Sequence, residues 1–201
     1  MIAHPAPTSL VDAKARLRAE ALARRRAVSN VTRLHLAERL VREGLHLARR
    51  WRPLVISAFH PLRDEPDTLP LIAALALDGF STALPVTLSR AAPLRFRLWK
   101  PGDALIRGQM NIAEPPPEAT EVEPDLLFAP LAAFDRSGHR IGYGAGHYDR
   151  VIAVLRGRKP VHAVGVAFAT SEVEAIPSEP HDEALDAILT ETETIFPRGA
   201  P

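Results

Sequence analysis

Apolar residues recur at helical spacing through the first fifty residues of the chain. This pattern predicts an amphipathic helix over residues 10–27 and a second over residues 31–50, with Pro53 ending the helical region. Residues 1–9 contain two prolines and are expected to form a loose tail. The apolar positions behind these predictions are Leu10, Ala13, Leu17, Ala21 and Leu22 in the first helix and Leu34, Ala37, Leu40, Val41 and Leu47 in the second.

Short apolar runs alternate with helical segments in the rest of the chain. Their length and their β-branched and aromatic content favour buried strands. Basic and apolar residues alternate over residues 94–99, which predicts a half-buried edge strand. The proline-rich residues 101–124 are expected to form a long surface connection, a lid or a wall of a site. The remaining predicted elements are strands at 54–59, 80–86, 126–129 and 161–168, extended pieces at 187–190 and 194–196, and helices at 67–77 and 147–157.

This alternation of strands and helices predicts an α/β fold with a largely parallel central sheet. At 201 residues the chain is expected to form one domain, over 1–201, with the helices of residues 10–50 as a basic arm packed on an α/β core. It contains no cysteine, which excludes disulfides, thiolate zinc sites and a cysteine nucleophile. No signal peptide and no apolar run long enough to span a membrane are visible, so a cytoplasmic protein is expected.

The stretch GHRIGYGAGHYDR, from Gly138 to Arg150, carries the strongest candidate chemistry. Its three glycines, Gly142, Gly144 and Gly146, stand at alternate positions, where a packed helix or strand would lose roughly 0.5–1 kcal/mol per glycine. A loop that turns through positive φ before a helix presents free N–H groups and the positive end of the helix dipole, which favours an anion. Arg140 would add charge for a phosphate, and Asp149 could hold a cation bound to it. A glycine hinge without a ligand is the alternative.

Three further groups could belong to the same site. Lys14 and Arg18 lie four residues apart, on one face of the first helix. Glu65 follows the first predicted strand, where open α/β sheets bind ligands. Asp182 could meet Asp149 only through the fold, and together they would offer the oxygen ligands that Mg²⁺ prefers. His147 and His181 flank these aspartates, but a hydrogen-bonding or surface role is favoured for both.

The charge along the chain is uneven. Residues 10–52 hold 12 Lys and Arg against 4 Asp and Glu, whereas residues 114–196 hold 6 against 15. A basic arm can bind nucleic acid, serve a phosphorylated ligand or simply be a solvated helix face. Aromatic residues make up only 5% of the chain and do not interleave with the basic ones, which disfavours nucleic-acid binding.

These residues resemble 5-formyltetrahydrofolate cyclo-ligase, also called methenyltetrahydrofolate synthetase. The resemblance rests on Lys14 and Arg18, on Glu65 after LVISAF, on PLAAFDRSGHRIGYGAGHYDR from Pro130, and on PSEPHDEALDAILT from Pro177. It covers nearly the whole chain. It implies a three-layer α/β/α fold similar to sugar-phosphate isomerases and coenzyme A transferases, and a ligase of one-carbon metabolism that closes 5-formyltetrahydrofolate to 5,10-methenyltetrahydrofolate with ATP and Mg²⁺, releasing ADP and phosphate.

The resemblance also assigns residues to roles. The metal ligands would be Asp149 and Asp182. Lys14, Glu65 and Arg140 would be catalytic, and His60 and Glu65 would line the folate site. Nucleotide binding would involve Lys14, Arg18, Arg140, Ile141, Gly142, Tyr143, Gly144, Ala145, Gly146, His147 and Tyr148, of which Tyr143 to His147 would also face the folate.

Two departures from the family pattern concern this loop. Ala145 stands where many relatives carry Lys or Gly, and His147 replaces the first residue of a common Tyr-Tyr pair. The expected partners are 5-formyltetrahydrofolate and ATP, with no nucleic acid and no membrane, and a monomer is expected. The alternatives are a sugar-phosphate isomerase-like or degenerate nucleotide-binding relative of the same fold, and a nucleic-acid-binding module that uses the basic arm.

Overall fold

Parallel strands form the middle of one mixed sheet. The computed structural model describes residues 9–108 and 111–197. The sheet has the order β12-β11-β10-β7-β1-β2-β3-β6 and is antiparallel at both ends. The parallel strands are β1 (Val55–Ser57), β2 (Ser81–Val86), β7 (Leu126–Pro130), β10 (His162–Val166) and β11 (Ala187–Leu189), and the antiparallel ones are β3 (Arg95–Leu98), β6 (Glu121–Val122) and β12 (Thr194–Ile195).

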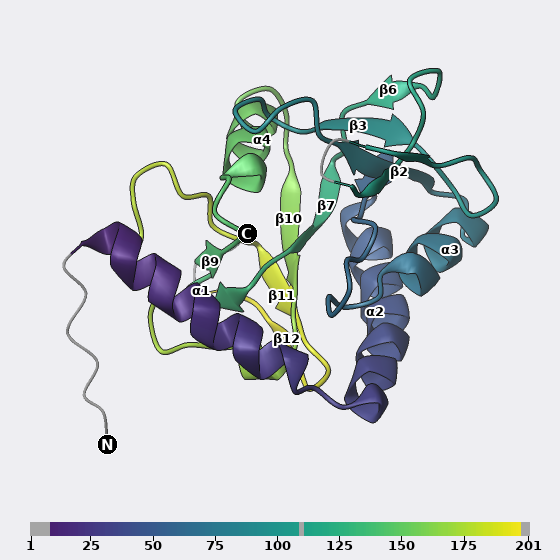
Figure 1. The fold of residues 1–201 in the computed structure, drawn as a ribbon. Coiled ribbons are helices and arrows are strands. Elements are labelled where there is room, and N and C mark those ends of the chain that lie inside the picture. Colours follow the sequence, from purple (N-terminus) through teal and green to yellow (C-terminus); the bar gives the residue numbers. More distant parts are fainter. Residues whose placement is uncertain (1–8, 109–110, 198–201) are drawn as a thin grey trace.

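Helices cover both faces of this sheet (Figure 1). The helices α2 (Asn30–Trp51) and α3 (Leu69–Leu77) pack on one face. On the other face lies α4 (His147–Arg156), whereas α1 (Leu10–Arg26) packs through Ala21 on a separate small cluster with Ala133 and Ile141. The predicted three-layer α/β/α architecture is confirmed.

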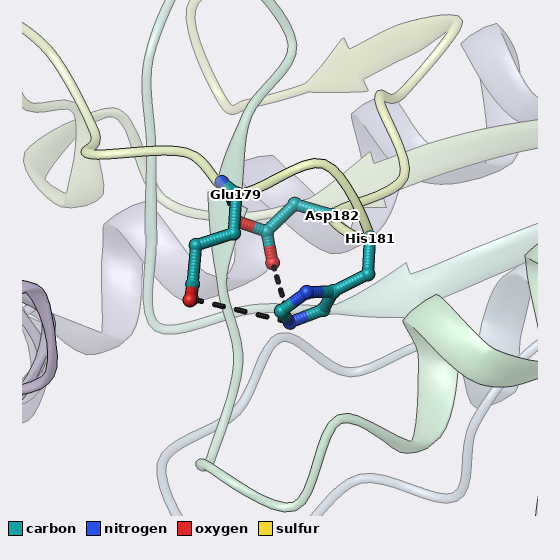
Figure 2. Close-up of side chains that lie close together, drawn as sticks. All are labelled: Glu179, His181 and Asp182. Carbon is teal, nitrogen blue, oxygen red and sulfur yellow. Dashed lines mark hydrogen bonds and ion pairs between the residues drawn. The ribbon is translucent and has the colours of Figure 1, made fainter.

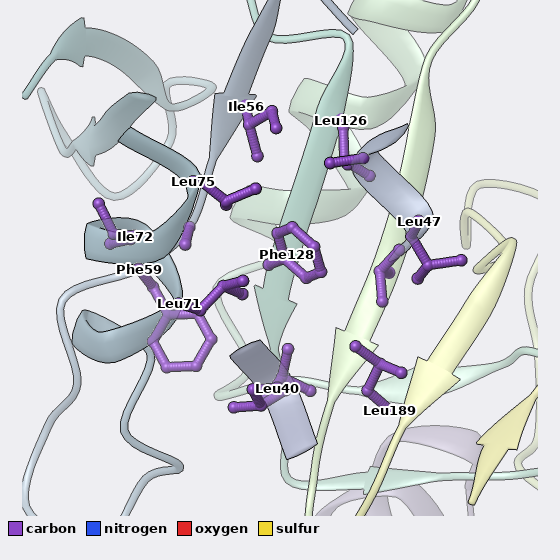
Figure 3. Packing of buried hydrophobic residues seen from close by; sticks show 14 of the residues in the cluster. Leu40, Leu47, Ile56, Phe59, Leu71, Ile72, Leu75, Leu126, Phe128 and Leu189 are labelled. Atoms are coloured by element: carbon purple, nitrogen blue, oxygen red, sulfur yellow. The ribbon is translucent and has the colours of Figure 1, made fainter. Parts of the chain in front are cut away.

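Alternation along the central strands builds the two halves of the core. In β7, Leu126 and Phe128 join the cluster under α2 and α3, whereas Leu127 joins the cluster under α4. This is the period of two that a strand buried on both faces requires. Phe128 lies in the middle of the first cluster, with Leu40 of α2 and Leu71 of α3 close by (Figure 3).

The chain changes direction across the sheet at β1 and β7. From β1 it proceeds to β2 on one side, and it later returns to β7, β10 and β11 on the other. Ligand sites in open parallel sheets lie at such a switch point, outside the carboxyl ends of the strands. The loop after β1 contains Glu65, and the segment after β7 contains the glycine-rich stretch, so the fold delivers both to this edge.

The connection over residues 101–124 contains more structure than predicted. Its last part, β6, pairs with β3, so the expectation that residues 94–99 form an edge strand is wrong. Backbone hydrogen bonds to β3 and not side-chain hydrophobicity place this short strand, which is why the proline-rich sequence did not reveal it. Two short hairpins complete the elements: β4 (Ile106–Arg107) with β5 (Ala113–Glu114), and β8 (Ala133–Phe134) with β9 (Arg140–Ile141), beside the 3₁₀ turn η1 (Ala169–Ser171).

Both N-terminal helices form where predicted, and their buried faces agree with the prediction in part. Ser9, assigned to the tail, is the N-cap of α1 and accepts a hydrogen bond from the Asp12 amide, while residues 1–8 lie outside the described part of the chain. Leu34 of α2 is 64% exposed, and the core position is Leu36 instead. Among the described helices, none is long and apolar enough to cross a membrane.

Candidate active site

The glycine-rich loop connects β9 to α4. Gly144 and Gly146 have φ values of +94° and +63°, a region that side-chain-bearing residues rarely enter. Gly142 does not share this conformation, so the expectation of a positive φ holds for two of the three glycines. Gly146 is the N-cap of α4 and offers no side chain to the first turn, which leaves the amide groups there for an incoming anion.

One face of α1 lies against this loop and its neighbours. Arg18 donates from Nε to the carbonyl oxygen of Gly142 at 2.7 Å. Lys14 Nζ lies 2.6 Å from Asp182 Oδ2 and 2.9 Å from Glu179 Oε2. Partial burial opposes the charge of Lys14, but these two carboxylates outweigh it and raise the pKa of Lys14. Glu179 and Asp182 thus supply the anions for Lys14, whereas Arg18 binds a neutral backbone carbonyl.

Arg140 is buried and bound to the first turn of α4. Its Nη2 donates to Asp149 Oδ1 at 2.7 Å, and its Nη1 donates to the carbonyl oxygen of Glu183. The Glu183 amide also donates to Asp149 Oδ1, at 3.3 Å. Because Glu183 follows Asp182 directly, these contacts bring the segment that carries Asp182 alongside Asp149.

The two aspartates predicted to hold a metal each keep one carboxylate oxygen that could bind it. Each uses one oxygen, Asp149 Oδ1 or Asp182 Oδ2, for hydrogen bonds. No hydrogen bond from a described residue reaches Asp149 Oδ2 or Asp182 Oδ1. The lysine and the Glu179 amide outweigh the effect of partial burial and hold the pKa of Asp182 below its ordinary value. A charged carboxylate with an oxygen that accepts no hydrogen bond suits a hard cation.

A third carboxylate lies beside Asp182. Glu179, His181 and Asp182 each offer a ligand atom within 4.8 Å of the others, and Figure 2 shows both carboxylates directed at the His181 ring. Sequence reasoning missed Glu179, although it stands in the same Pro-Ser-Glu-Pro-His-Asp loop as Asp182. Mg²⁺ prefers oxygen, so the carboxylates fit it better than the exposed imidazole does.

The loop after β1 meets the glycine-rich loop through Glu65 and Tyr143. The Tyr143 hydroxyl donates to Glu65 Oε1, and the Leu62 amide donates to Glu65 Oε2 at 2.8 Å. Glu65 is only 6% exposed. Burial raises the pKa of its carboxyl, and the two hydrogen bonds and the charge of Arg25 act in the opposite direction. Burial and the adjacent Glu65 also raise the pKa of Tyr143, which keeps its hydroxyl a donor.

Arg25 is a site residue that sequence reasoning missed. It is 4% exposed, donates from Nη1 to the Tyr143 hydroxyl at 2.7 Å and contacts Asp64 through Nε at 3.1 Å. The spacing along the helix could have revealed Arg25 in the sequence. It lies eleven residues after Lys14 and seven after Arg18, and so continues their face of the helix. Of the apolar face predicted for α1, Ala21 is buried, while Ala13, Leu17 and Leu22 are half-buried and Leu10 is exposed, so that prediction is confirmed in part.

The remaining predicted site residues lie at different places around the glycine-rich loop and the loop after β1. Ile141 is buried in a small apolar cluster, and Tyr148 packs against the core cluster under α4. His147 contacts the carbonyl oxygen of Ala92 through Nδ1, while its buried Nε2 has no hydrogen-bond partner among the described residues. His60 is half-buried and lines a pocket of about 360 Å³ beside the loop after β1.

Known proteins match nearly the whole chain. The family model described as "5-formyltetrahydrofolate cyclo-ligase family" matches residues 11–191. The 5-formyltetrahydrofolate cyclo-ligase of Mycolicibacterium smegmatis is 34% identical over 187 residues, covering 88% of this chain and 93% of that protein. The Escherichia coli K12 enzyme of the same name is 35% identical over 140 residues, covering 67% and 76%.

A solved structure agrees with this match. The NMR structure of the 5,10-methenyltetrahydrofolate synthetase of Aquifex aeolicus superposes with a TM-score of 0.77 at 26% identity, covering 94% of each chain. The family match, the relatives and this structure together show that the chain belongs to the 5-formyltetrahydrofolate cyclo-ligase family of enzymes.

Proposed function

We propose that this chain closes 5-formyltetrahydrofolate to 5,10-methenyltetrahydrofolate and that the reaction consumes ATP in the presence of Mg²⁺. The observation that carries the proposal is the meeting of two loops at the switch point of the sheet. One is a glycine-rich loop before a helix N-terminus, suited to phosphates. The other holds the buried Glu65, and the Tyr143–Glu65 hydrogen bond joins the two loops.

Phosphoryl transfer would overcome the low reactivity of the formyl group, whose nitrogen donates electrons into the carbonyl. The formyl oxygen attacks the γ-phosphorus of ATP, the new O–P bond forms, and the bond to ADP breaks. The second folate nitrogen then attacks the formyl carbon and loses its proton. Phosphate departs with the electrons of the C–O bond, which leaves the five-membered ring.

Such a transfer asks the protein for positioning and charge neutralisation more than for a nucleophile. We assign Lys14, Arg18 and Arg140, with the loop amides, to the phosphates. Asp149 and Asp182 would hold Mg²⁺, which neutralises phosphate charge when bound. Glu65 would bind the pterin or the reacting nitrogens, and His60 would line the folate site. The ion pair between Lys14 and Asp182 supports this assignment. A nucleotide phosphate could replace Asp182 beside Lys14, and Mg²⁺ could replace Lys14 beside Asp182.

The same geometry weighs against the basic arm as a nucleic-acid surface. Lys14, Arg18 and Arg25 all bind acceptors within the protein and not a free face of α1. A role in phosphate binding would use these cations in the orientations that they already have.

The decisive experiment mixes purified protein with 5-formyltetrahydrofolate, ATP and Mg²⁺ and follows the absorbance of the product. We expect product only when both ATP and Mg²⁺ are present. Turnover without ATP, or no turnover at all, would overturn the proposal. Within this assay, Asp149→Asn should lower turnover on the order of 100-fold with the fold intact by circular dichroism. A normal Mg²⁺ dependence of this variant would remove Asp149 from the metal site.

A further inference from the structure

The two aspartates assigned to the metal are held by the fold in different ways. Asp149 stands in the first turn of α4, so the hydrogen bonds of the helix fix its backbone. Asp182 lies between η1 and β11, where residues 173–186 form no helix or strand. Two carboxylates can bind one cation only if their spacing is kept. The place of Asp182 therefore depends on what its segment contacts.

Arg156, the last residue of α4, holds the chain directly after Asp182. Its Nη1 donates to Glu183 Oε2 at 2.8 Å and to the carbonyl oxygen of Ala184 at 2.9 Å. Its Nη2 donates to Asp186 Oδ2 at 2.8 Å. The three side chains of these ion pairs are only 27%, 25% and 13% exposed, so solvent screens the pairs less than it screens pairs on the open surface.

The first turn of α4 binds the same segment. The Glu183 amide donates to Asp149 Oδ1, and its carbonyl oxygen accepts a hydrogen bond from Arg140. Arg156 lies seven residues after Asp149 and so on the same face of α4. One face of this helix thus presents one metal ligand at its start and, at its end, the guanidinium group that holds the segment of the other.

We propose that Arg156 is a positioning residue for the cation site: it holds the segment that carries Asp182 against α4, so that Asp182 and Asp149 bind the same divalent cation. The proposal rests on the proposed function, in which these aspartates hold Mg²⁺. Arg156 acts through the segment, because none of its hydrogen bonds joins it to either aspartate. Its loss should therefore weaken binding of the cation and leave binding of the folate unchanged.

Binding of Mn²⁺ without nucleotide or folate tests this role apart from catalysis. Mn²⁺ prefers the same oxygen ligands as Mg²⁺, and electron paramagnetic resonance follows the free ion during a titration of the protein. We expect Arg156→Gln to raise the dissociation constant on the order of 10-fold, since groups that orient metal ligands typically contribute 10- to 100-fold to affinity. Asp182→Asn should abolish this binding and so identifies the site.

Three outcomes overturn the positioning role. They are a wild-type protein that binds no Mn²⁺, an Asp182→Asn variant that binds it normally, and an Arg156→Gln variant with the wild-type affinity. Arg158→Gln is the matched control, because Arg158 is an exposed arginine two residues further on that pairs with Glu123 and not with the segment of Asp182. Its affinity for Mn²⁺ should equal that of the wild-type protein.

Glu183→Gln tests the same contact from the other side and carries the test if Arg156→Gln fails to fold by circular dichroism. It removes one partner of Arg156 and keeps the backbone contacts of the segment, so we expect a smaller loss of affinity. The double variant should bind Mn²⁺ no more weakly than Arg156→Gln alone, because both changes break one ion pair. Unchanged affinity in Glu183→Gln, or fully additive losses, would contradict the proposal.

The assay under the proposed function separates the failure of the reaction from the failure of the positioning role. In Arg156→Gln, the Mg²⁺ concentration for half-maximal turnover should rise on the order of 10-fold while KM for folate stays unchanged. Weakened Mn²⁺ binding in a protein without ATP-dependent turnover would overturn the reaction and support the positioning role. ATP-dependent turnover with the wild-type Mg²⁺ requirement in Arg156→Gln would do the reverse.

Discussion

The two N-terminal helices have similar basic composition but attach to the protein in different ways. α2 buries Leu36, Leu40 and Leu47 in the main core, against α3 and the sheet. α1 buries only Ala21 and Arg25 and is attached mainly through the polar ends of Lys14, Arg18 and Arg25. The difference teaches that two basic helices can attach by different means: α2 through buried apolar side chains, and α1 through polar contacts with the loops of the candidate site.

The largest effect should come from the apolar side of this comparison. Leu40→Ala removes a fully buried side chain and leaves a cavity, so we expect the free energy of unfolding to fall by about 2–5 kcal/mol. Leu34→Ala, at an exposed position of the same helix, is the control and should change it by less than about 0.5 kcal/mol. Urea titration measures both, and equal losses would contradict the assignment of the α2 face.

On the polar side, Lys14→Met should affect function more than folding. Under the proposed function we expect kcat/KM for ATP to fall on the order of 100-fold, equivalent to about 2.7 kcal/mol, because a charge-stabilising donor is lost. Arg16→Met is the control, since Arg16 is exposed on another face of α1. If KM for folate rises and that for ATP does not, Lys14 belongs to the folate side.

Arg25 belongs to both sides of the comparison, because it is buried and charged. Arg25→Met leaves Asp64 without its partner and frees the Tyr143 hydroxyl, so we expect a loss of about 1–3 kcal/mol in the free energy of unfolding. KM for folate should rise more than KM for ATP. The exposed neighbour gives the control Arg26→Met. Full rescue by Arg25→Lys would show that charge alone matters and not the two-sided geometry of the guanidinium group.

Acid should loosen α1 before α2, and this is the smallest expected effect. Partial burial opposes ionisation of Asp64 and Asp182, but their partners Arg25 and Lys14 outweigh it and hold both pKa values below the ordinary 3.8. The stabilisation is therefore complete above about pH 3.8 and is lost as the pH falls through the lowered values.

Hydrogen exchange, corrected for intrinsic rates, should show α1 peptides losing protection by several-fold between pH 4 and pH 3 while α2 core peptides keep theirs. Simultaneous loss in both helices would show that charge pairing does not hold α1 separately.

Local patterns in the sequence predicted most of the elements. The spacing of apolar residues predicted α2, and the buried apolar runs predicted β1, β7 and β10 within a few residues. These predictions succeed because the hydrophobic patterns of helices and strands repeat over a few residues of the chain. The glycine-rich stretch predicted the loop and the helix after it. The same local information could not place β6, whose position depends on pairing with β3.

The sequence by itself determined which residue types were available to the site, and in Lys14 and Arg18 it also determined a shared helix face. Only the tertiary structure decided which groups meet: Glu65 with Tyr143 across two strands, Lys14 with Asp182 across most of the chain, and Arg25 turned inward. The physical reason is that these contacts depend on the order of strands in the sheet and on burial, which no local pattern encodes.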